Sequence, residues 1–191
     1  MMTDVYTTCP TFSSKHFDYR QVTTKDAPDL LQAYSDTKSV PLFNSDNCGG
    51  DDFHYTTIER MTNAIDYWQE EYQLRGFVRW SILDQVTNLA IGTVEIFDRN
   101  AGDFFDDTAI LRLDLRNDFE KKAIIREILT IYMAATPSLF TSAKMATKAP
   151  EFATERAAAL TEAGFRLSTE KLIGHKGEAY DHYYVYSFAR D

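Results

Sequence analysis

The sequence of 191 residues has few of the residues that build metal sites and disulfides. Its two cysteines, Cys9 and Cys48, form no Cys-x-x-Cys pair, and its four histidines lack metal-ligand spacing to one another or to the cysteines. At most one disulfide is available, so a reduced compartment is the simpler expectation. The sequence therefore predicts a protein without a bound metal.

Positive charge and long apolar runs are also scarce. Lys and Arg number 20 against 29 Asp and Glu, which gives a net charge of -9. Neutralising phosphates requires a basic face, so we expect no nucleic-acid partner, while a cationic amine substrate is compatible. No apolar run approaches the roughly 20 residues that span a bilayer. The first residues, MMTDVYTTCPTFSSK, lack the basic start and apolar centre of a signal peptide. We therefore expect a cytoplasmic protein without a membrane segment.

What the sequence does contain is enough apolar material for one domain. Apolar residues make up 44% and aromatic residues 14%, which indicates a sizeable core and argues against disorder. Residues 1–15 are polar and rich in Thr and Ser, so we expect a loose N-terminal arm, followed by one folded domain over residues 16–191. Residues 39–55 hold the only Gly-Gly pair and are expected to form an ordered loop of functional size.

The central stretch is Ala109–Leu129, whose pattern predicts a buried strand, a charged turn and a helix. Ala109–Leu115 is dominated by aliphatic residues and has the length of a strand. The first amides of a helix lack intrahelical partners, and the helix dipole favours an anion there. Lys121, Lys122 and Arg126 gather at this helix start, where they either hold an anion or simply solvate the helix end. The helix is expected to end before Pro137.

A second helix is predicted from the spacing of its apolar residues. Thr56 and Glu59 have capping-box spacing at its start, and Gly76 is expected to end it. Its apolar stripe consists of Ile58, Met61, Ile65, Trp68 and Tyr72. Aromatic residues at regular spacing are usually core, and a pocket floor is the alternative for Trp68, Tyr72 and Trp80.

The remaining elements complete a mixed order of strands and helices. Strands are expected at 16–22, 77–83, 89–97 and 143–148, an alanine-rich helix at 151–163, and a closing hairpin from strands 165–173 and 179–188. An antiparallel half thus joins a β-α-β-α-β half. The predicted fold class is α/β (α+β), a single domain with a mixed, largely antiparallel sheet and helices on both faces.

This order resembles the GNAT superfamily of N-acetyltransferases over roughly residues 17–189. Three local matches carry the resemblance, and the branch that acetylates the N-termini of ribosomal proteins is the most similar. Arg79–Ile82 followed by Ala90–Glu95 looks like the paired strands before the family's cofactor motif. Leu113–Leu129 looks like that motif, with Glu127 where related enzymes often carry a helix glutamate, and Ala153–Phe165 looks like the late helix and its Gly-Phe.

The resemblance implies that acetyl-CoA binds as co-substrate at the central strand and helix start. The acetyl carbonyl is then expected along the central strand near Leu113, Asp114 and Leu115. The family's pyrophosphate loop has the pattern Gln or Arg, two residues, Gly, one residue, then Gly or Ala. In this sequence it falls on Glu120–Ile125, where the pattern is degenerate. The cofactor-binding positions implied are Leu113, Leu115, Glu120, Lys121, Lys122, Ala123, Ile124, Ile125 and Arg126. The family's late-helix tyrosine, a general acid, corresponds to Leu160.

Two acidic residues inside apolar strands are candidate bases. Glu95 lies within TVEIF and Asp114 within LRLDL, and a carboxylate in an apolar strand is costly to bury unless it is paired or used. Either is then a catalytic base with a raised pKa. The alternative is that both form ion pairs with Arg79, Arg112 or Arg116.

The resemblance predicts an enzyme, an acetyl-CoA-dependent N-acetyltransferase that acts by direct attack of a primary amine. The acceptor is then a small molecule or a peptide, and homodimers are frequent in the family. The alternative is a non-catalytic GNAT-like binding or regulatory domain, in which the altered loop no longer binds acetyl-CoA in the usual way.

Overall fold

The computed structural model describes residues 4–189, and its frame is a mixed sheet with eight strands. The strand order is β1-β2-β3-β4-β5-β6-β10-β7, and each neighbouring pair is antiparallel except β5 and β6. The strands are β1 (Phe12–Ser13), β2 (Phe17–Gln21), β3 (Val78–Asp84), β4 (Ala90–Arg99), β5 (Thr108–Leu115), β6 (Lys144–Lys148), β7 (Arg166–Leu167) and β10 (Tyr183–Ser187). A separate pair consists of β8 (Leu172–Ile173) and β9 (Ala179–Tyr180). The predicted fold class is confirmed.

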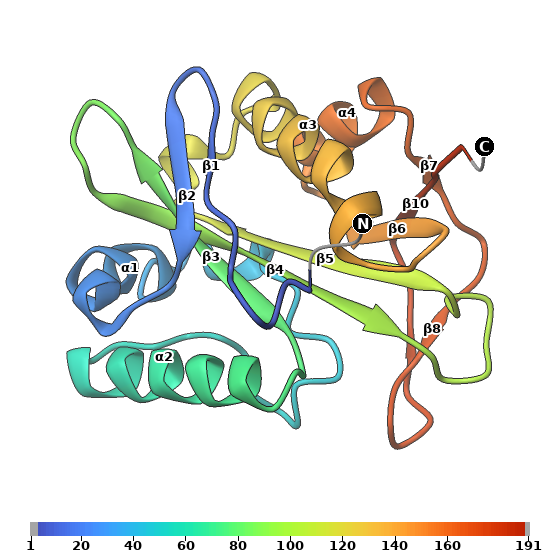
Figure 1. The fold of residues 1–191 in the computed structure, drawn as a ribbon, viewed down its shortest axis with the longest axis horizontal. Helices are drawn as coiled ribbons and strands as arrows, with labels where there is room; N and C mark the ends of the chain where they lie inside the picture. Colours follow the sequence, from blue (N-terminus) through green and yellow to red (C-terminus); the bar gives the residue numbers. More distant parts are fainter. Residues whose placement is uncertain (1–3, 190–191) are drawn as a thin grey trace.

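Helices cover both faces of this sheet (Figure 1). The α-helices are α1 (Ala27–Tyr34), α2 (Ile58–Gln73), α3 (Lys122–Leu139) and α4 (Thr154–Glu162), and short 3-10 turns lie at Thr24–Asp26, Val40–Leu42 and Asn117–Phe119. Figure 1 shows α1 and α2 together on one side of the sheet and α3 and α4 together on the other. None of the helices in residues 4–189 has the length and apolar character that crossing a membrane requires.

Strand alternation gives the central strands two different faces. Successive side chains of a strand point to opposite sides of a sheet. Toward α3 point the apolar residues Val78, Trp80, Ile82, Val94, Ile96, Leu111, Leu113 and Leu115, all buried in one core cluster. Toward α2 point polar and charged residues that are also buried, namely Arg79, Ser81, Thr93, Glu95 and Asp114. One face is an ordinary core, and the other carries buried charge.

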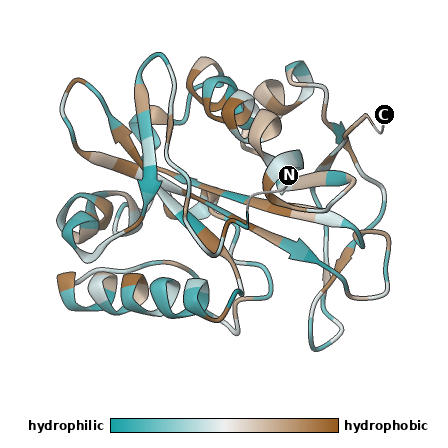
Figure 2. Cartoon of the chain, in the orientation of Figure 1, coloured by the Kyte–Doolittle hydropathy of each residue, from teal (hydrophilic) through white to brown (hydrophobic). Residues whose placement is uncertain are grey.

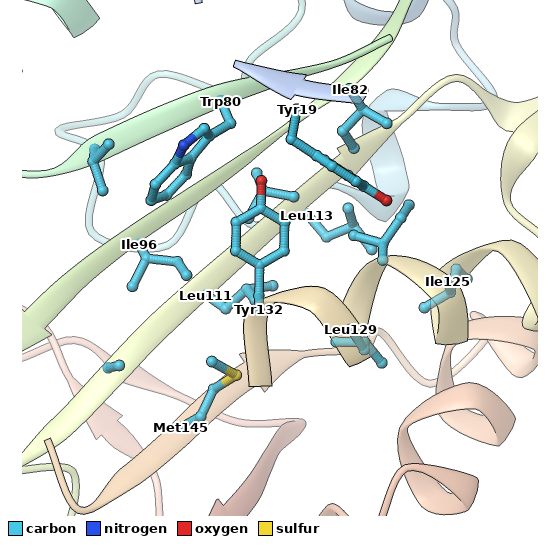
Figure 3. Close-up of a cluster of buried hydrophobic side chains, with 14 of the residues drawn as sticks. Tyr19, Trp80, Ile82, Ile96, Leu111, Leu113, Ile125, Leu129, Tyr132 and Met145 are labelled. Atoms are coloured by element: carbon cyan, nitrogen blue, oxygen red, sulfur yellow. The ribbon is translucent and has the colours of Figure 1, made fainter. Parts of the chain in front are cut away.

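The apolar face packs against α3 (Figure 3). Tyr132 rises from α3 toward Trp80 and Tyr19, with ring centroids 5.2 Å from Trp80 and 5.6 Å from Tyr19. Ile125 and Leu129 lie on the same side of α3 and are fully or almost fully buried. Leu113 and Leu115, predicted to touch the cofactor, therefore direct their side chains into this core.

A second core lies under α1 and α2. The predicted stripe on α2 is buried at Met61, Ile65, Trp68 and Tyr72, whereas Ile58, at the first helical position, is 48% exposed. Figure 2 shows brown and teal residues alternating along α2, as expected of an amphipathic helix. Between the strands, a Cβ on Gly92 would lie 2.1 Å from the Asp114 carbonyl oxygen, so the close approach of β4 and β5 requires glycine there.

Three predicted element boundaries are wrong. Helix α2 begins after Thr57, whose side chain accepts a hydrogen bond from the Arg60 amide. After the helix, the chain turns at Arg75, which has a left-handed φ of 63°, so Gly76 is not the residue that ends the helix. Helix α3 continues through Pro137, because a proline in the last turns removes one hydrogen bond while Leu139 and Phe140 gain a place in the core.

The third wrong boundary is the closing hairpin, which is divided. His182 has a φ of 63°, and the chain turns there, so β7 pairs with β10 while β8 pairs with β9. At the other end, the segment expected to be a loose arm packs against the domain from residue 4 onward. Val5 is buried, its carbonyl accepts from Tyr72 OH at 2.9 Å, and β1 pairs with β2. Residues 1–3 lie outside the described residues.

Candidate functional site

Glu95 is held between two guanidinium groups by the register of the sheet. Arg79 and Arg112 are its cross-strand partners on β3 and β5. Arg112 Nη1 donates to Glu95 Oε1 at 2.7 Å, and Arg79 donates to Oε2 through Nε at 3.1 Å and through Nη2. Burial favours the neutral acid, but the two arginines outweigh burial and lower the pKa of Glu95. Glu95 is therefore a carboxylate at neutral pH and a weak base.

Asp114 belongs with Arg79, Glu95 and Arg112 to one set of paired charges on this face of the sheet, called here the charged row. Its Oδ2 accepts from Tyr34 OH at 2.7 Å and from Arg79 Nη1 at 3.1 Å. Its Oδ1 is buried and has no hydrogen-bond partner in the described part of the chain. Burial raises the pKa of Asp114, and the charge of Arg79 offsets that effect only in part. Of the two predicted bases, only Asp114 has a pKa above its ordinary value.

Both carboxylates form the ion pairs that the sequence offered as the alternative to catalysis. Arg79 and Arg112 supply the partners, while Arg116 pairs with Asp118 instead. The catalytic role of Glu95 and Asp114 stays a prediction, because an ion pair does not decide whether a carboxylate also takes a proton.

A cavity of about 620 Å³ lies between α2, the loop 47–55 and the charged row. Arg79, Glu95 and Arg112 contribute to its lining, and Asp114 does not. Its walls are rich in aromatic rings, including Phe53, Trp68 and Phe97. Trp68 thus belongs both to the core and to the pocket wall, whereas Trp80 lies in the core facing α3. Cavities of this size are typical of small-molecule sites.

At the start of α3, carboxylates of α4 occupy the predicted anion position. The Lys122 amide, the first of the helix, donates to Glu155 Oε2 at 2.7 Å. Lys122 Nζ and Arg126 Nη1 pair with Glu162 at 2.6 and 2.8 Å. A carboxylate at a helix N-terminus makes the contact that a phosphate would make. The predicted cations and amide therefore fit an anion, and the chain itself provides one.

The gap between β5 and β6 is also filled by the chain. The parallel ladder ends at Leu111 and Thr147, so the end of β5 has no strand neighbour on that side. Arg156 of α4, 2% exposed, pairs with Glu120 at 2.7 Å and donates to the Leu42 carbonyl at 2.8 Å. Its charge also acts on Asp114. A cofactor arm reaching the charged row through this gap would have to displace that pair.

The other predicted cofactor residues divide between surface and core. Lys121, Lys122, Ala123 and Arg126 are exposed, Ile124 is half-buried and Ile125 is fully buried. The structure brings the exposed ones together at the helix start. Glu127 lies farther along α3 and accepts from Ser14 and His16.

Sequence reasoning missed three residues that shape the site. Tyr34 bonds Asp114, Arg156 fills the gap, and Glu155 caps α3. Only Arg156 carried a signal, since it is an arginine within an alanine-rich helix that has an apolar side. Among residues 4–189, no cluster of three or more His, Cys, Asp or Glu side chains is arranged to hold a metal.

Comparison with known proteins identifies solved structures with a similar fold but no similar sequence. No protein-family model and no curated protein matches the sequence. A solved GNAT-family acetyltransferase from Bacillus anthracis matches with a TM-score of 0.65 at 14% identity, covering 93% of this chain and 98% of its own. Ribosomal-protein-S5-alanine acetyltransferase from Vibrio fischeri matches with a TM-score of 0.67 at 14% identity, covering 92% and 94%.

A third solved structure is the microcin C7 self-immunity acetyltransferase MccE, in complex with acetyl-CoA and AMP. It has a TM-score of 0.66 at 16% identity and covers 91% of this chain and 93% of its own. These likenesses show that the chain has the fold of GNAT acetyltransferases, as the sequence resemblance predicted. At this level of identity, the likenesses show the fold alone, and the reaction depends on the residues of the site.

Proposed function

We propose that this chain is an N-acetyltransferase that moves an acetyl group from acetyl-CoA to a primary amine by direct attack. The observation that carries the proposal is the GNAT fold combined with a cavity of about 620 Å³ that reaches the charged row of β3, β4 and β5. The amine is held in this cavity, beside Glu95. Acetyl-CoA, when bound, supplies the activated acetyl thioester.

The residues that would hold the cofactor's phosphates lie at the start of α3. The Lys122 amide, Lys122 Nζ and Arg126 already bind carboxylates there, and Lys121 is exposed beside them. Phosphates would use the same donors once Glu155 and Glu162 give way. Glu120 is paired with Arg156, so its charge no longer stands alone at an anion site.

An ammonium acceptor must lose a proton before it attacks, and the two carboxylates meet different requirements for that step. Glu95 lines the cavity, but arginines hold both of its oxygens. Asp114 has the raised pKa and a free Oδ1, but it lies behind the cavity wall. A water that bridged the amine and Asp114 Oδ1 would let Asp114 take the proton without lining the cavity.

A second candidate function is a non-catalytic GNAT-like binding or regulatory domain. The specific observation in its favour is the Arg156–Glu120 pair, which is buried in the gap between β5 and β6. Removing one partner of a buried ion pair costs roughly 3–5 kcal/mol, so opening this gap opposes cofactor entry.

Thermal unfolding with acetyl-CoA separates the two candidates. A ligand at about 100 times its Kd adds roughly 2.7 kcal/mol of stability, or about 5–10 °C in Tm for a domain of this size. We expect such a shift with acetyl-CoA and a smaller one with adenosine alone. No shift at millimolar acetyl-CoA would exclude the acetyltransferase and leave the binding domain.

If acetyl-CoA binds, the rate of amine acetylation by the Asp114→Asn variant tests whether Asp114 is the proton acceptor. Loss of a general base lowers the rate by about 10²–10⁴-fold, and the amide keeps the shape of the side chain. Full activity in this variant would remove Asp114 as the base. Glu95→Gln, once its folding has been verified, tests the other candidate in the same assay.

A further inference from the structure

Three carboxylates line the cavity beside α2, and one of them has no cation. Asp51 pairs with Arg60, and Glu95 pairs with Arg79 and Arg112. Glu71, on the last turns of α2, has no ion-pair partner in the described chain. Arg60, Arg79 and Arg112 all have carboxylate partners, so Glu71 is the one carboxylate of the lining that no cation neutralises directly.

The aromatic rings of the cavity show the same imbalance. Five of the six rings in its lining already face an arginine. The closest pairs are Arg79 over Trp68 at 4.0 Å and Arg60 over Tyr55 at 4.2 Å. The sixth ring, Tyr67, packs edge-on against Phe77, has no cation over it in the described part of the chain and is 55% exposed. A ring face attracts a cation, so the exposed ring of Tyr67 is suited to contact a positively charged ligand.

Tyr67 and Glu71 stand one turn apart on α2 and therefore share a helix face. Their closeness also appears electrostatically, since burial and then the Glu71 carboxylate raise the pKa of Tyr67. Gly76 makes room for the carboxylate, because a Cβ there would lie 2.2 Å from Glu71 Oε2. The backbone does not need glycine at this position, since the left-handed residue is Arg75. The Glu71 carboxylate therefore accounts for the glycine at position 76, whereas the end of the helix does not require it.

We propose that Glu71 and Tyr67 form a subsite for a positively charged nitrogen at the mouth of the cavity. The ligand that fits is an ammonium compound with a flat apolar body, its charge between the carboxylate and the ring and its body against Phe77 and Phe97. This subsite assigns a residue pair to the amine of the proposed function. It rests on that function only for the step after binding.

The test is ligand binding without acetyl-CoA, so its outcome is separate from that of the cofactor experiment. The probes are 2-phenylethylamine and the neutral 2-phenylethanol, which has nearly the same shape. We expect the amine to raise the Tm of the protein more than the alcohol does, and added salt to weaken amine binding. Glu71→Gln should weaken amine binding by roughly three- to tenfold and leave the alcohol unaffected.

Two further variants make the test specific. Glu70→Gln removes the same charge from the neighbouring exposed residue, which does not line the cavity, and should leave amine binding unchanged. Gly76→Ala should fold normally, since only the flexible end of Glu71 must move, and should weaken amine binding as Glu71→Gln does. Equal binding of amine and alcohol, no amine binding at millimolar concentration, or an unchanged affinity in Glu71→Gln would each overturn the proposal.

Discussion

Buried charge on one face of the sheet is the costly feature of this molecule at the scale of single residues. Two arginines and two carboxylates of the charged row are at most 11% exposed in their side chains. The charges balance, and a buried set of this kind is tolerated because each charge has a partner. An uncharged core of the same volume would be at least as stable, so the row points to a use beyond folding.

Glu95→Gln should destabilise the protein by roughly 3–5 kcal/mol, because two buried guanidiniums would lose their common partner. The free energy of unfolding in urea at pH 7 measures this directly. Glu70→Gln, an exposed carboxylate, should change it by no more than about 0.5 kcal/mol. A loss of less than about 1 kcal/mol in Glu95→Gln would mean that the arginines reach water or another acceptor.

A pH-dependent contribution is expected from Glu127. Its carboxylate accepts from Ser14 Oγ at 2.6 Å, from the His16 amide at 2.8 Å and from His16 Nδ1 at 2.7 Å. Burial opposes the charged form, but these bonds outweigh burial and lower the pKa of Glu127 below its ordinary value of 4.5. A lowered folded-state pKa stabilises the protein above the unfolded pKa, and that stability is lost as the pH falls through the folded value.

Glu127→Gln should therefore cost roughly 1–2 kcal/mol at pH 7. The difference from the unmodified protein should shrink as the pH falls below 4.5, the ordinary value for this carboxyl. Urea unfolding at pH 7 and at decreasing acidic pH gives both numbers. A difference that stays constant or grows on acidification would show that the hydrogen bonds do not depend on the charge of Glu127.

At the scale of elements, α4 acts on the start of α3. Glu155→Gln would replace the carboxylate that the first amide of α3 binds with a neutral amide. The free energy of unfolding should therefore fall by roughly 0.5–1 kcal/mol. Under the proposed function, the same change should tighten acetyl-CoA binding, since a competing anion is lost. Isothermal titration of both proteins with acetyl-CoA measures the effect.

The control for that experiment is Glu151→Gln, an exposed carboxylate just before α4. It changes the net charge equally without touching α3. Equal affinities in Glu155→Gln and Glu151→Gln would show that Glu155 does not compete with the cofactor.

The elements were predictable wherever their periodicity is local. Strands β3, β4 and β5 and helix α2 follow from alternation and from helical spacing over a few residues. Two boundaries were predicted wrongly because a single residue, Arg75 or His182, has a positive φ. Arginine rarely adopts this conformation, and most histidines do not adopt it either, so neither residue marks the turn in the sequence. Pro137 failed for a different reason, since tertiary packing of the last turn outweighed propensity.

At the scale of the whole molecule, the site was predictable only in part. Glu95 and Asp114 stood out because an acidic residue inside an apolar strand needs an explanation. Their surroundings did not, because the contacts join distant segments: Tyr34 and Asp114 are 80 residues apart, and Arg156 and Leu42 are 114 apart. No pattern within one segment encodes such pairs. The contacts of Arg156 with Glu120 and Leu42 at the gap between β5 and β6, which favour the second candidate function, are of this kind.

The two faces of the sheet also divide the optical properties of the molecule. Its two tryptophans lie on opposite sides: Trp68 lines the cavity under the Arg79 guanidinium, and Trp80 sits in the core beside Tyr132. The fluorescence of Trp68 should therefore respond to ligand binding in the cavity, and that of Trp80 to global unfolding. In Trp80→Phe, the remaining emission comes from the cavity alone, so this protein contains its own reporter for each of the events discussed above.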